Sequence, residues 1–397
     1  MQRFYDDEGM NFAVLIALGS AYAGLADVGE TLATIERIPE GDQEAWVTQW
    51  TATADRLAAQ AEESSAGGHR VSARSRFLRA ATYYDNASAM APGSKDPSRF
   101  TSLWEKHRSC WDRAVDLFTT PVERIAVPYE DTTLEGYFFS PDGSARPRPT
   151  VILSNGSDGP VSSQWSQGGR AAVERGWNAV TVDGPGQGAA LHRQGRYFRF
   201  DWEQVVTPVV DFLVARDDVD PDGIALHGIS QSGYWAPRAA AFEHRLAALV
   251  ADPGVMRVAS SWEQHLPPGM ADLLDQGNKA DFDALMAADP DPQRQAMLAW
   301  RMAPYGVTSP FDAYQAARKM TLDDATVAQI ACPTLVLSPD HEQFWPGQSQ
   351  QLFDALRCDK RLVPFTVEEG ADWHCEPAAQ SLRDERVFDF LEEVLVG

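Results

Sequence analysis

The sequence predicts an α/β fold in which a mostly parallel, eight-stranded sheet with helices on both faces follows an all-helical N-terminal domain. Apolar residues recur at helical spacing between about residues 30 and 120, without a strand signal. From residue 121 onward, short apolar runs alternate with helical stretches. A helical segment at about 256–328 interrupts this alternation and is expected to form a lid. We therefore expect a helical domain over residues 1–120 and an α/β domain over residues 121–397.

The helical domain is predicted from two apolar stripes, each of which follows one face of a helix. The stripes consist of Trp46, Trp50, Leu57 and Ala61, and of Phe77, Leu78, Ala81, Tyr84 and Ala87. An apolar segment at 11–26 precedes them. The acidic residues Asp6, Asp7 and Glu8 stand before it, which is the wrong charge for a signal peptide, and the segment is too short for a good membrane span. We expect a buried helix there and a cytoplasmic protein.

The α/β domain is predicted to begin with a hairpin of alternating strands at 122–130 and 132–141. Short apolar runs then predict the remaining strands, at 150–156, 178–184, 223–228, 247–254, 334–339 and 362–369. Helical stretches separate most of them, at roughly 162–176, 202–216, 233–243, 347–357 and 380–395. Because strands that alternate with helices favour parallel pairing, the hairpin should lie at the edge of the sheet.

Charge and cysteine content exclude several classes of function. The 34 lysines and arginines face 57 aspartates and glutamates, and the formal net charge is −23. A chain this acidic is not expected to bind nucleic acid or an anionic membrane surface. The four cysteines are scattered without C-x-x-C spacing, so neither a zinc site nor a disulfide framework is expected. No cofactor or metal is predicted, and a small molecule is the expected partner.

A candidate nucleophile lies in the segment LHGISQSGYW at 226–235. Ser230 follows an apolar strand and precedes a helix, which is the context of a nucleophile elbow. The residues two before and two after such a serine must be small, because the chain turns sharply there. Gly228 meets this requirement, whereas Ser232 stands where glycine is usual and is followed by Gly233. We expect Ser230 to be the nucleophile and Ser232 to bond a backbone N–H at the start of the helix.

A serine nucleophile needs a base and an orienting carboxylate, which in this architecture follow it in the order acid, histidine. His374 lies between the last strand and the last helix, where the base is expected, and His341 is the other late histidine. The acid usually stands four residues before a proline that opens the next helix, which selects Glu342. Asp340 remains the alternative acid, because a loop register read from one sequence is uncertain by about two residues.

The oxyanion formed by such a nucleophile requires two backbone donors. Gln231, directly after the nucleophile, supplies one at the start of the helix. The second is expected from the loop NGSDG after the strand at 150–156, with Ser157 preferred over Gly156. Further candidate pocket residues are Asp158, Asp183, Arg199 and Asp201, for the last three of which structural bracing is an equal alternative. The DGPGQG run at 183–188 lacks the lysine of a phosphate loop and is read as a tight turn at the active edge of the sheet.

Motifs along nearly the whole chain resemble those of the FrsA-like branch of the α/β-hydrolases. They include RFLRAATYYDNAS, IAVPYEDTTLEGYFF, VDGPGQG, FDWEQVVTPVVDFL, GIALHGISQSGYWAPRAAAFEHRLAALVADPGV, EQFWPGQ and EGADWHCEP. This group includes 2,6-dihydroxypseudooxynicotine hydrolase and fungal pigment-pathway hydrolases that shorten polyketide chains. The resemblance implies an α/β-hydrolase fold with an N-terminal helical cap, a Ser230, Glu342 and His374 triad, and a homodimer. Ser232 departs from the usual GxSxGG pattern.

The sequence therefore predicts a cofactor-free serine hydrolase that acts on a small, aromatic or polyketide-like molecule. The resemblance adds cleavage of a C–C bond in a 1,3-diketone to the ester and amide bonds that such a triad hydrolyses. Three alternatives use the same fold: a lyase or cyclase acting on a polyketide intermediate, a peptidase of the prolyl-oligopeptidase type, and a non-catalytic binding protein. The helical N-terminal region argues against the peptidase, which would carry propeller blades there.

Overall fold

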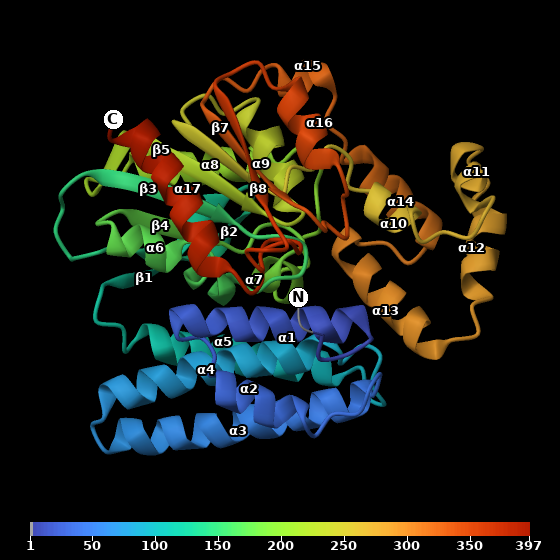
Figure 1. Cartoon of the computed structure of the whole chain (residues 1–397), viewed down its shortest axis with the longest axis horizontal. Coiled ribbons are helices and arrows are strands. Elements are labelled where there is room, and N and C mark those ends of the chain that lie inside the picture. Colours follow the sequence, from blue (N-terminus) through green and yellow to red (C-terminus); the bar gives the residue numbers. More distant parts are fainter. Residues whose placement is uncertain (1–2) are drawn as a thin grey trace.

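The computed structural model describes residues 3–397 and confirms the predicted fold class. Its sheet has eight strands in the order β1-β2-β4-β3-β5-β6-β7-β8. The hairpin of β1 and β2 pairs antiparallel and joins β4 antiparallel, whereas the other neighbours pair in parallel (Figure 1). The strands are β1 (Val122–Tyr129), β2 (Thr132–Phe139), β3 (Arg148–Ser154), β4 (Asn178–Val182), β5 (Val219–Ile229), β6 (Ala248–Asp252), β7 (Thr334–Pro339) and β8 (Lys360–Phe365). Every strand that the sequence predicted is therefore present.

Helices cover both faces of the sheet, because successive strand residues point to opposite sides and both sides are apolar. On β3, Ile152 packs in one cluster with α8 and α9, while Val151 and Leu153 pack in the other with α6 and α17. The helices of the α/β region outside the insertion are η2 (Val161–Trp165), α6 (Gly169–Glu174), α7 (Gly188–His192), α8 (Glu203–Val214), α9 (Ser232–Ala240), α16 (Gln348–Ala355) and α17 (Gln380–Leu395). The short helix α7, within the loop after β4, was not predicted.

The N-terminal helices pack against one another beside the sheet, at the bottom of the view in Figure 1. Aspartates begin several of them: the side chains of Asp7, Asp27 and Asp42 each accept a hydrogen bond from a backbone N–H of the first turn. The elements are α1 (Glu8–Ser20), η1 (Ala21–Ala23), α2 (Val28–Ile35), α3 (Gln43–Ala66), α4 (Arg70–Ala89) and α5 (Arg99–Val115). The apolar segment at 11–26 thus contributes most of α1, whose inner side is buried as expected, and continues into η1 and a short non-helical stretch.

The insertion between β6 and β7 is helical and has a small apolar cluster of its own. Met270, Leu274, Phe282 and Tyr314 form this cluster, and Trp262 packs against it. Figure 1 shows the insertion projecting to one side of the sheet. Its elements are α10 (Ser260–Glu263), α11 (Met270–Asp275), α12 (Lys279–Ala287), α13 (Pro292–Met302), η3 (Ala303–Tyr305), α14 (Pro310–Lys319) and α15 (Asp324–Val327).

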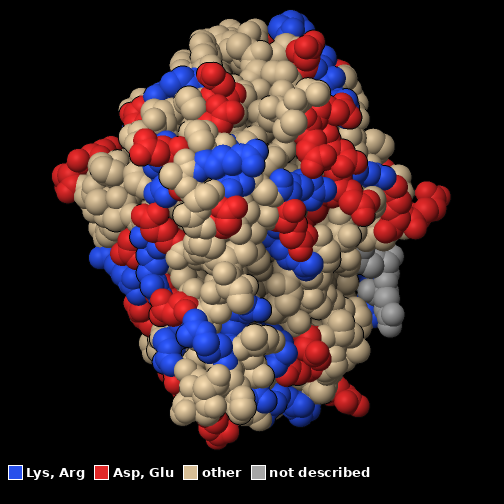
Figure 2. All heavy atoms as spheres, turned by 90° about the vertical axis from the view of Figure 1, so that its left-hand side faces the viewer, with Lys and Arg blue, Asp and Glu red and all other residues tan. Residues whose placement is uncertain are grey.

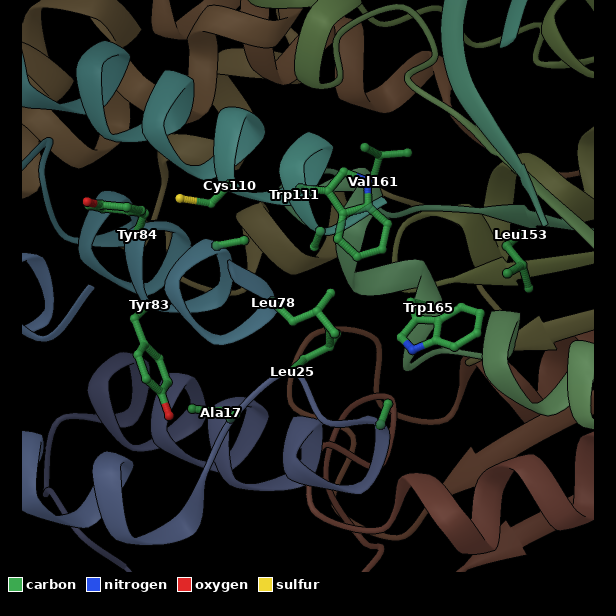
Figure 3. Packing of buried hydrophobic residues seen from close by; sticks show 14 of the residues in the cluster. Ala17, Leu25, Leu78, Tyr83, Tyr84, Cys110, Trp111, Leu153, Val161 and Trp165 are labelled. Atoms are coloured by element: carbon green, nitrogen blue, oxygen red, sulfur yellow. The ribbon is translucent and has the colours of Figure 1, made fainter. Parts of the chain in front are cut away.

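The N-terminal helices and one face of the sheet share a single apolar core (Figure 3). Trp111 of α5 meets Tyr137 of β2 edge-on, with ring centroids 5.6 Å apart. Trp165 of η2 packs against Phe118 and Phe139 at 4.9 and 5.4 Å. Because this core crosses the expected boundary near residue 120, the two regions bury apolar surface jointly, and their division into separate domains stays a prediction.

The surface carries charges of both signs. Basic and acidic side chains are interspersed over the face shown in Figure 2, so the positive charge there is not gathered into a stripe. Among residues 3–397, no helix combines the length and the apolar composition that crossing a lipid bilayer requires.

Candidate active site

Ser230 occupies a strained corner between β5 and α9. Its φ of 59° lies in the left-handed region, which a non-glycine residue adopts only where the surrounding structure enforces it. Two glycines make the corner sterically feasible. A Cβ on Gly228 would lie 2.3 Å from the Ser232 carbonyl oxygen, and a Cβ on Gly233 would lie 1.8 Å from the Pro253 carbonyl oxygen. The corner therefore has the geometry of a nucleophile elbow.

Ser232 opens α9, as expected, but its hydroxyl has a different partner from the one predicted. The Oγ lies 2.7 Å from the Oγ of Ser154 at the end of β3, and not on a backbone N–H of the first turn. Ser232 is fully buried. The close backbone approach that a small residue must permit occurs one position later, at Gly233. This explains how a serine is accommodated at the position where glycine is usual.

Three side chains from distant segments meet at this corner. Nε2 of His374 lies 2.9 Å from the Oγ of Ser230, and Nδ1 of His374 lies 2.8 Å from Oε2 of Glu342. All of these contacts are within the range of hydrogen bonds. In the neutral imidazole, Nδ1–H would donate to the carboxylate, which leaves Nε2 to accept the serine proton. The arrangement can deprotonate the serine hydroxyl and stabilise the resulting imidazolium.

Glu342 is held as a carboxylate by its surroundings. Its Oε1 accepts hydrogen bonds from the backbone N–H groups of Phe344 (2.9 Å) and Trp345 (3.1 Å). Burial alone would raise the pKa of Glu342, but His374 and these two amides lower that pKa below its ordinary value. Glu342 is therefore ionised at neutral pH.

Aromatic side chains enclose His374. Its ring centroid lies 4.7 Å from that of Phe344, 5.6 Å from that of Trp345 and 6.1 Å from that of Phe12 on α1. The N-terminal helices thus contribute directly to the site through Phe12. Phe12 was not predicted to lie at the site, since an apolar side chain on a buried helix carries no signal that distinguishes it from an ordinary core residue.

The two alternatives left open by the sequence lie elsewhere. Asp340 is exposed, and its backbone N–H donates to the carbonyl of Phe365. His341 is largely exposed, and its Nδ1 lies 2.8 Å from Oδ2 of Asp372. Neither contacts His374 through a hydrogen bond of the described residues. The carboxylate against His374 is therefore that of Glu342.

The loop after β3 lies over Ser230. The N–H of Gly156 donates to the side-chain oxygen of its neighbour Asn155 (2.9 Å), so it is already engaged. Within residues 3–397, the N–H groups of Ser157 and Gln231 take part in no hydrogen bond. Of the three predicted donors, these two N–H groups are therefore unengaged, and their role towards an oxyanion stays a prediction.

Gln187, in the DGPGQG run, braces this loop. Its amide nitrogen donates to the carbonyls of Asn155 (2.8 Å) and Gly156 (2.7 Å), and its oxygen accepts from the N–H of Gly184 (2.9 Å). The run forms a tight turn directly after β4, as interpreted from the sequence, and its place at an active edge stays a prediction. The supporting role of Gln187 was not foreseen, because it depends on the distance between two loops.

Gly156 leaves no room for a side chain beside Ser230. A Cβ there would lie 2.6 Å from Cβ and 3.0 Å from Oγ of Ser230. We expect Gly156→Ala to displace the loop and lower kcat/KM for p-nitrophenyl acetate by about 10²–10³-fold, the effect of losing one oxyanion donor. The control is Gly143→Ala, where the nearest atom is 3.8 Å away. Equal activity of both variants, with equal thermal stability, would contradict this placement of Gly156.

Three of the candidate pocket residues have structural partners. Asp183 is buried and accepts hydrogen bonds from Arg108 Nη1 of α5 (2.7 Å) and from the N–H of Ala189 (3.0 Å). Arg199 forms a two-point ion pair with Asp201, at 2.8 and 2.9 Å. Asp183 therefore ties the N-terminal helices to the sheet. These contacts favour the bracing interpretation over a role in binding.

Asp158, the remaining candidate, faces the helical insertion. It lies directly after Ser157, is exposed, and approaches Arg301 to 3.8 Å. Two polar groups lie near it: the carboxyl group of Asp85 on α4 and the buried hydroxyl of Tyr305. Burial, then the charge of Asp158, raises the pKa of Asp85 to about 7. Polar groups from both helical regions thus lie near the loop that covers Ser230.

The sequence is similar to a family of esterases and to several known hydrolases. The family model described as "Esterase FrsA-like" matches residues 35–252. The chain is 29% identical to the hydrolase LUC6 of Fusarium sp., over 99% of this chain and 98% of that protein. It is 27% identical to the 20-hydroxy-prefusarin hydrolase FUS2 of Gibberella moniliformis, with the same two coverages. The similarity therefore extends over the full length of these relatives.

A solved structure shares the whole architecture. The crystal structure of 2,6-dihydroxy-pseudo-oxynicotine hydrolase superposes with a TM-score of 0.75, covers 95% of each chain and is 21% identical in sequence. At this level of identity, the likeness concerns the fold, including the N-terminal helices and the insertion.

Proposed function

The chain belongs to the FrsA-like esterase family and is an enzyme with hydrolase activity of the α/β-hydrolase type, and on this premise we propose that it is a serine hydrolase with Ser230 as nucleophile, His374 as base and Glu342 as orienting acid. The observation that carries the proposal is the 2.9 Å contact between Ser230 Oγ and His374 Nε2, continued by the 2.8 Å contact between His374 Nδ1 and Glu342. Serine and imidazole at this separation are poised for proton transfer.

In the acylation step, Ser230 Oγ attacks a substrate carbonyl carbon while its proton passes to His374 Nε2. The N–H groups of Gln231 and Ser157 hold the oxyanion, and removal of either donor would cost about 3 kcal/mol in the barrier. Glu342 stabilises the imidazolium. The bond from the carbonyl carbon to the leaving group then breaks, and His374 gives its proton to that group.

The leaving group decides which bond is broken. From an ester, it is an alkoxide oxygen. From a 1,3-diketone, it is the α-carbon of an enolate, which His374 protonates to a ketone. Water then attacks the acyl-enzyme, gives its proton to His374, and releases a carboxylic acid and free Ser230. The overall reaction adds one water to the diketone and yields one acid and one ketone.

We propose a small aromatic or polyketide-like substrate. The aromatic enclosure of His374 by Phe12, Phe344 and Trp345 supports an apolar partner. The name of the relative FUS2, a 20-hydroxy-prefusarin hydrolase, supports a substrate of natural-product type. The homodimer implied by the family resemblance is likewise a proposal.

Fluorophosphonate labelling tests the nucleophile. We expect one adduct on Ser230 in the native protein, identified by peptide mass spectrometry, and no adduct after heat denaturation. Because a fluorophosphonate requires an activated serine, the absence of labelling in native protein would refute the proposed triad and favour a binding protein with this fold.

Oxygen labelling separates hydrolysis from the lyase or cyclase alternative. With benzoylacetone or p-nitrophenyl acetate in H₂¹⁸O, a hydrolase places one ¹⁸O in the acid product. A lyase or cyclase would consume a polyketide-type substrate without incorporating ¹⁸O. Turnover of the ester with no cleavage of the diketone would restrict the proposal to esters.

A further inference from the structure

Two fully buried carboxyl groups lie behind the proposed triad. Asp252 ends β6, and Glu376 stands two residues after His374; both residues are 0% exposed. Their carboxyl groups lie within hydrogen-bonding reach of each other. Neither forms a hydrogen bond with any other described donor. Two carboxyl groups in contact can bond only if one of them carries a proton.

The surrounding charges allow this pair only one negative charge. Arg383 of α17, which is 0% exposed, is the cation that faces it, and the anions Asp384 and Glu342 already lie in the same region. Burial, and then Asp252, raises the pKa of Glu376 well above its ordinary value. Burial also raises the pKa of Asp252 to about 6, although Arg383 and His374 oppose this. The pair therefore retains a proton at neutral pH.

Two further titratable groups lie near the pair, but neither carries a charge that could compensate the charge of the pair. Burial raises the pKa of the Cys375 thiol well above its ordinary value, so the thiol is uncharged. Burial, and then Arg383, lowers the pKa of His227 on β5 to about 3, so this imidazole is uncharged as well. Arg383 thus remains the counter-charge.

The pair sits where the nucleophile corner and the base loop meet. The backbone carbonyl of Asp252 accepts the N–H of Ser230 at 2.6 Å and the thiol of Cys375 at 3.3 Å. Cys375 and Glu376 have φ values of 57° and 45°, in the left-handed region. Such a conformation persists only where neighbouring structure holds it. The Glu376 side chain is placed to hold this turn against the end of β6.

We propose that Asp252 and Glu376 share one proton and, as positioning residues, fix the loop of His374 against the corner of Ser230. The proposal rests on the proposed function in so far as it concerns catalysis. Loss of the shared proton would leave two adjacent buried carboxylates, whose repulsion would release the loop. The enzyme should therefore lose activity at alkaline pH as the pair ionises.

The same pair links stability to pH. A folded-state pKa raised above that of the unfolded chain means that the folded protein binds more protons between the two values. Folding stability then falls as pH rises from about 4.5 toward the raised pKa of Glu376. Glu376→Gln removes this dependence, because an amide keeps the hydrogen bond to the Asp252 carboxylate and does not ionise.

The experiment compares Glu376→Gln with Glu376→Ala, and uses Glu385→Gln on the exposed side of α17 as the matched control. With p-nitrophenyl acetate between pH 6 and 10, the glutamine variant should keep kcat within about threefold of the native enzyme at pH 7, and its alkaline limb should move up by about one pH unit. The alanine variant should lose at least about 30-fold in kcat, with KM changed by less than about threefold. Equal profiles of the two variants would overturn the proposal.

Thermal unfolding provides a readout that needs no catalysis. All proteins carry Ser230→Ala. The increase in Tm caused by Glu376→Gln should be larger at pH 9 than at pH 6, whereas the Tm change caused by Glu385→Gln should be the same at both pH values. A Tm difference independent of pH refutes the shared proton even if the alanine variant fails to fold. If the native protein is not labelled by fluorophosphonate but shows the pH-dependent Tm difference, the proposed function fails and the shared proton stands.

Discussion

Ser230→Ala is expected to lower kcat by at least about 10⁴-fold, without a loss of thermal stability. The alanine removes the attacking oxygen, so the remaining site can only bind the substrate and polarise its carbonyl. Alanine retains the Cβ and can occupy the same backbone conformation, so the corner at φ 59° should persist. Single-turnover kinetics with p-nitrophenyl acetate, together with thermal unfolding, measures both effects.

Ser232→Ala is the matched control for that experiment. It deletes a hydroxyl two residues away whose partner is Ser154 at 2.7 Å, with no contact to His374. We expect this variant to keep most of the activity, at a stability cost of about 1 kcal/mol for the lost hydrogen bond. If Ser232→Ala were inactive and Ser230→Ala active, the assignment of the two serines would be reversed.

Glu342→Gln is expected to reduce kcat by about 10⁴-fold, or about 5 kcal/mol in the barrier. The amide would remove the negative charge that stabilises the imidazolium. Its NH₂ group would also favour the tautomer in which Nδ1 accepts, which leaves Nε2 protonated and unable to take the serine proton. The measurement is kcat at pH 7 on an ester substrate, with fluorophosphonate labelling to report the reactivity of Ser230.

Asp340→Asn makes the same chemical change two residues away. Asp340 is exposed, and the carboxylate that contacts His374 belongs to Glu342. We expect full activity from this variant. If the Asp340→Asn variant were inactive and the Glu342→Gln variant active, the loop would have to rearrange during catalysis. Asp340 would then be the orienting acid.

Much of the fold could be predicted from local patterns. Each strand from 122 onward was predicted, because apolar runs bounded by turn residues reflect the burial of both sheet faces. The helix at Ser232–Ala240 was placed within a residue or two of its observed start. The five-residue helix at Gly188–His192 was missed, since so short an element leaves no periodic signal.

The sequence by itself determined that Ser230 stands at a strand-to-helix corner, because strand pattern, small residues and helix start are all local properties. It also narrowed the base and the acid to two candidates each. Only the tertiary structure shows that Glu342, and not Asp340, contacts His374, that the Gly156 N–H is already engaged, and that Asp252 lies beside Glu376. The physical reason is that Ser230 and His374 are 144 residues apart, so their contact depends on how several loops pack at one edge of the sheet. Side-chain direction in such loops follows from packing, which no local pattern encodes.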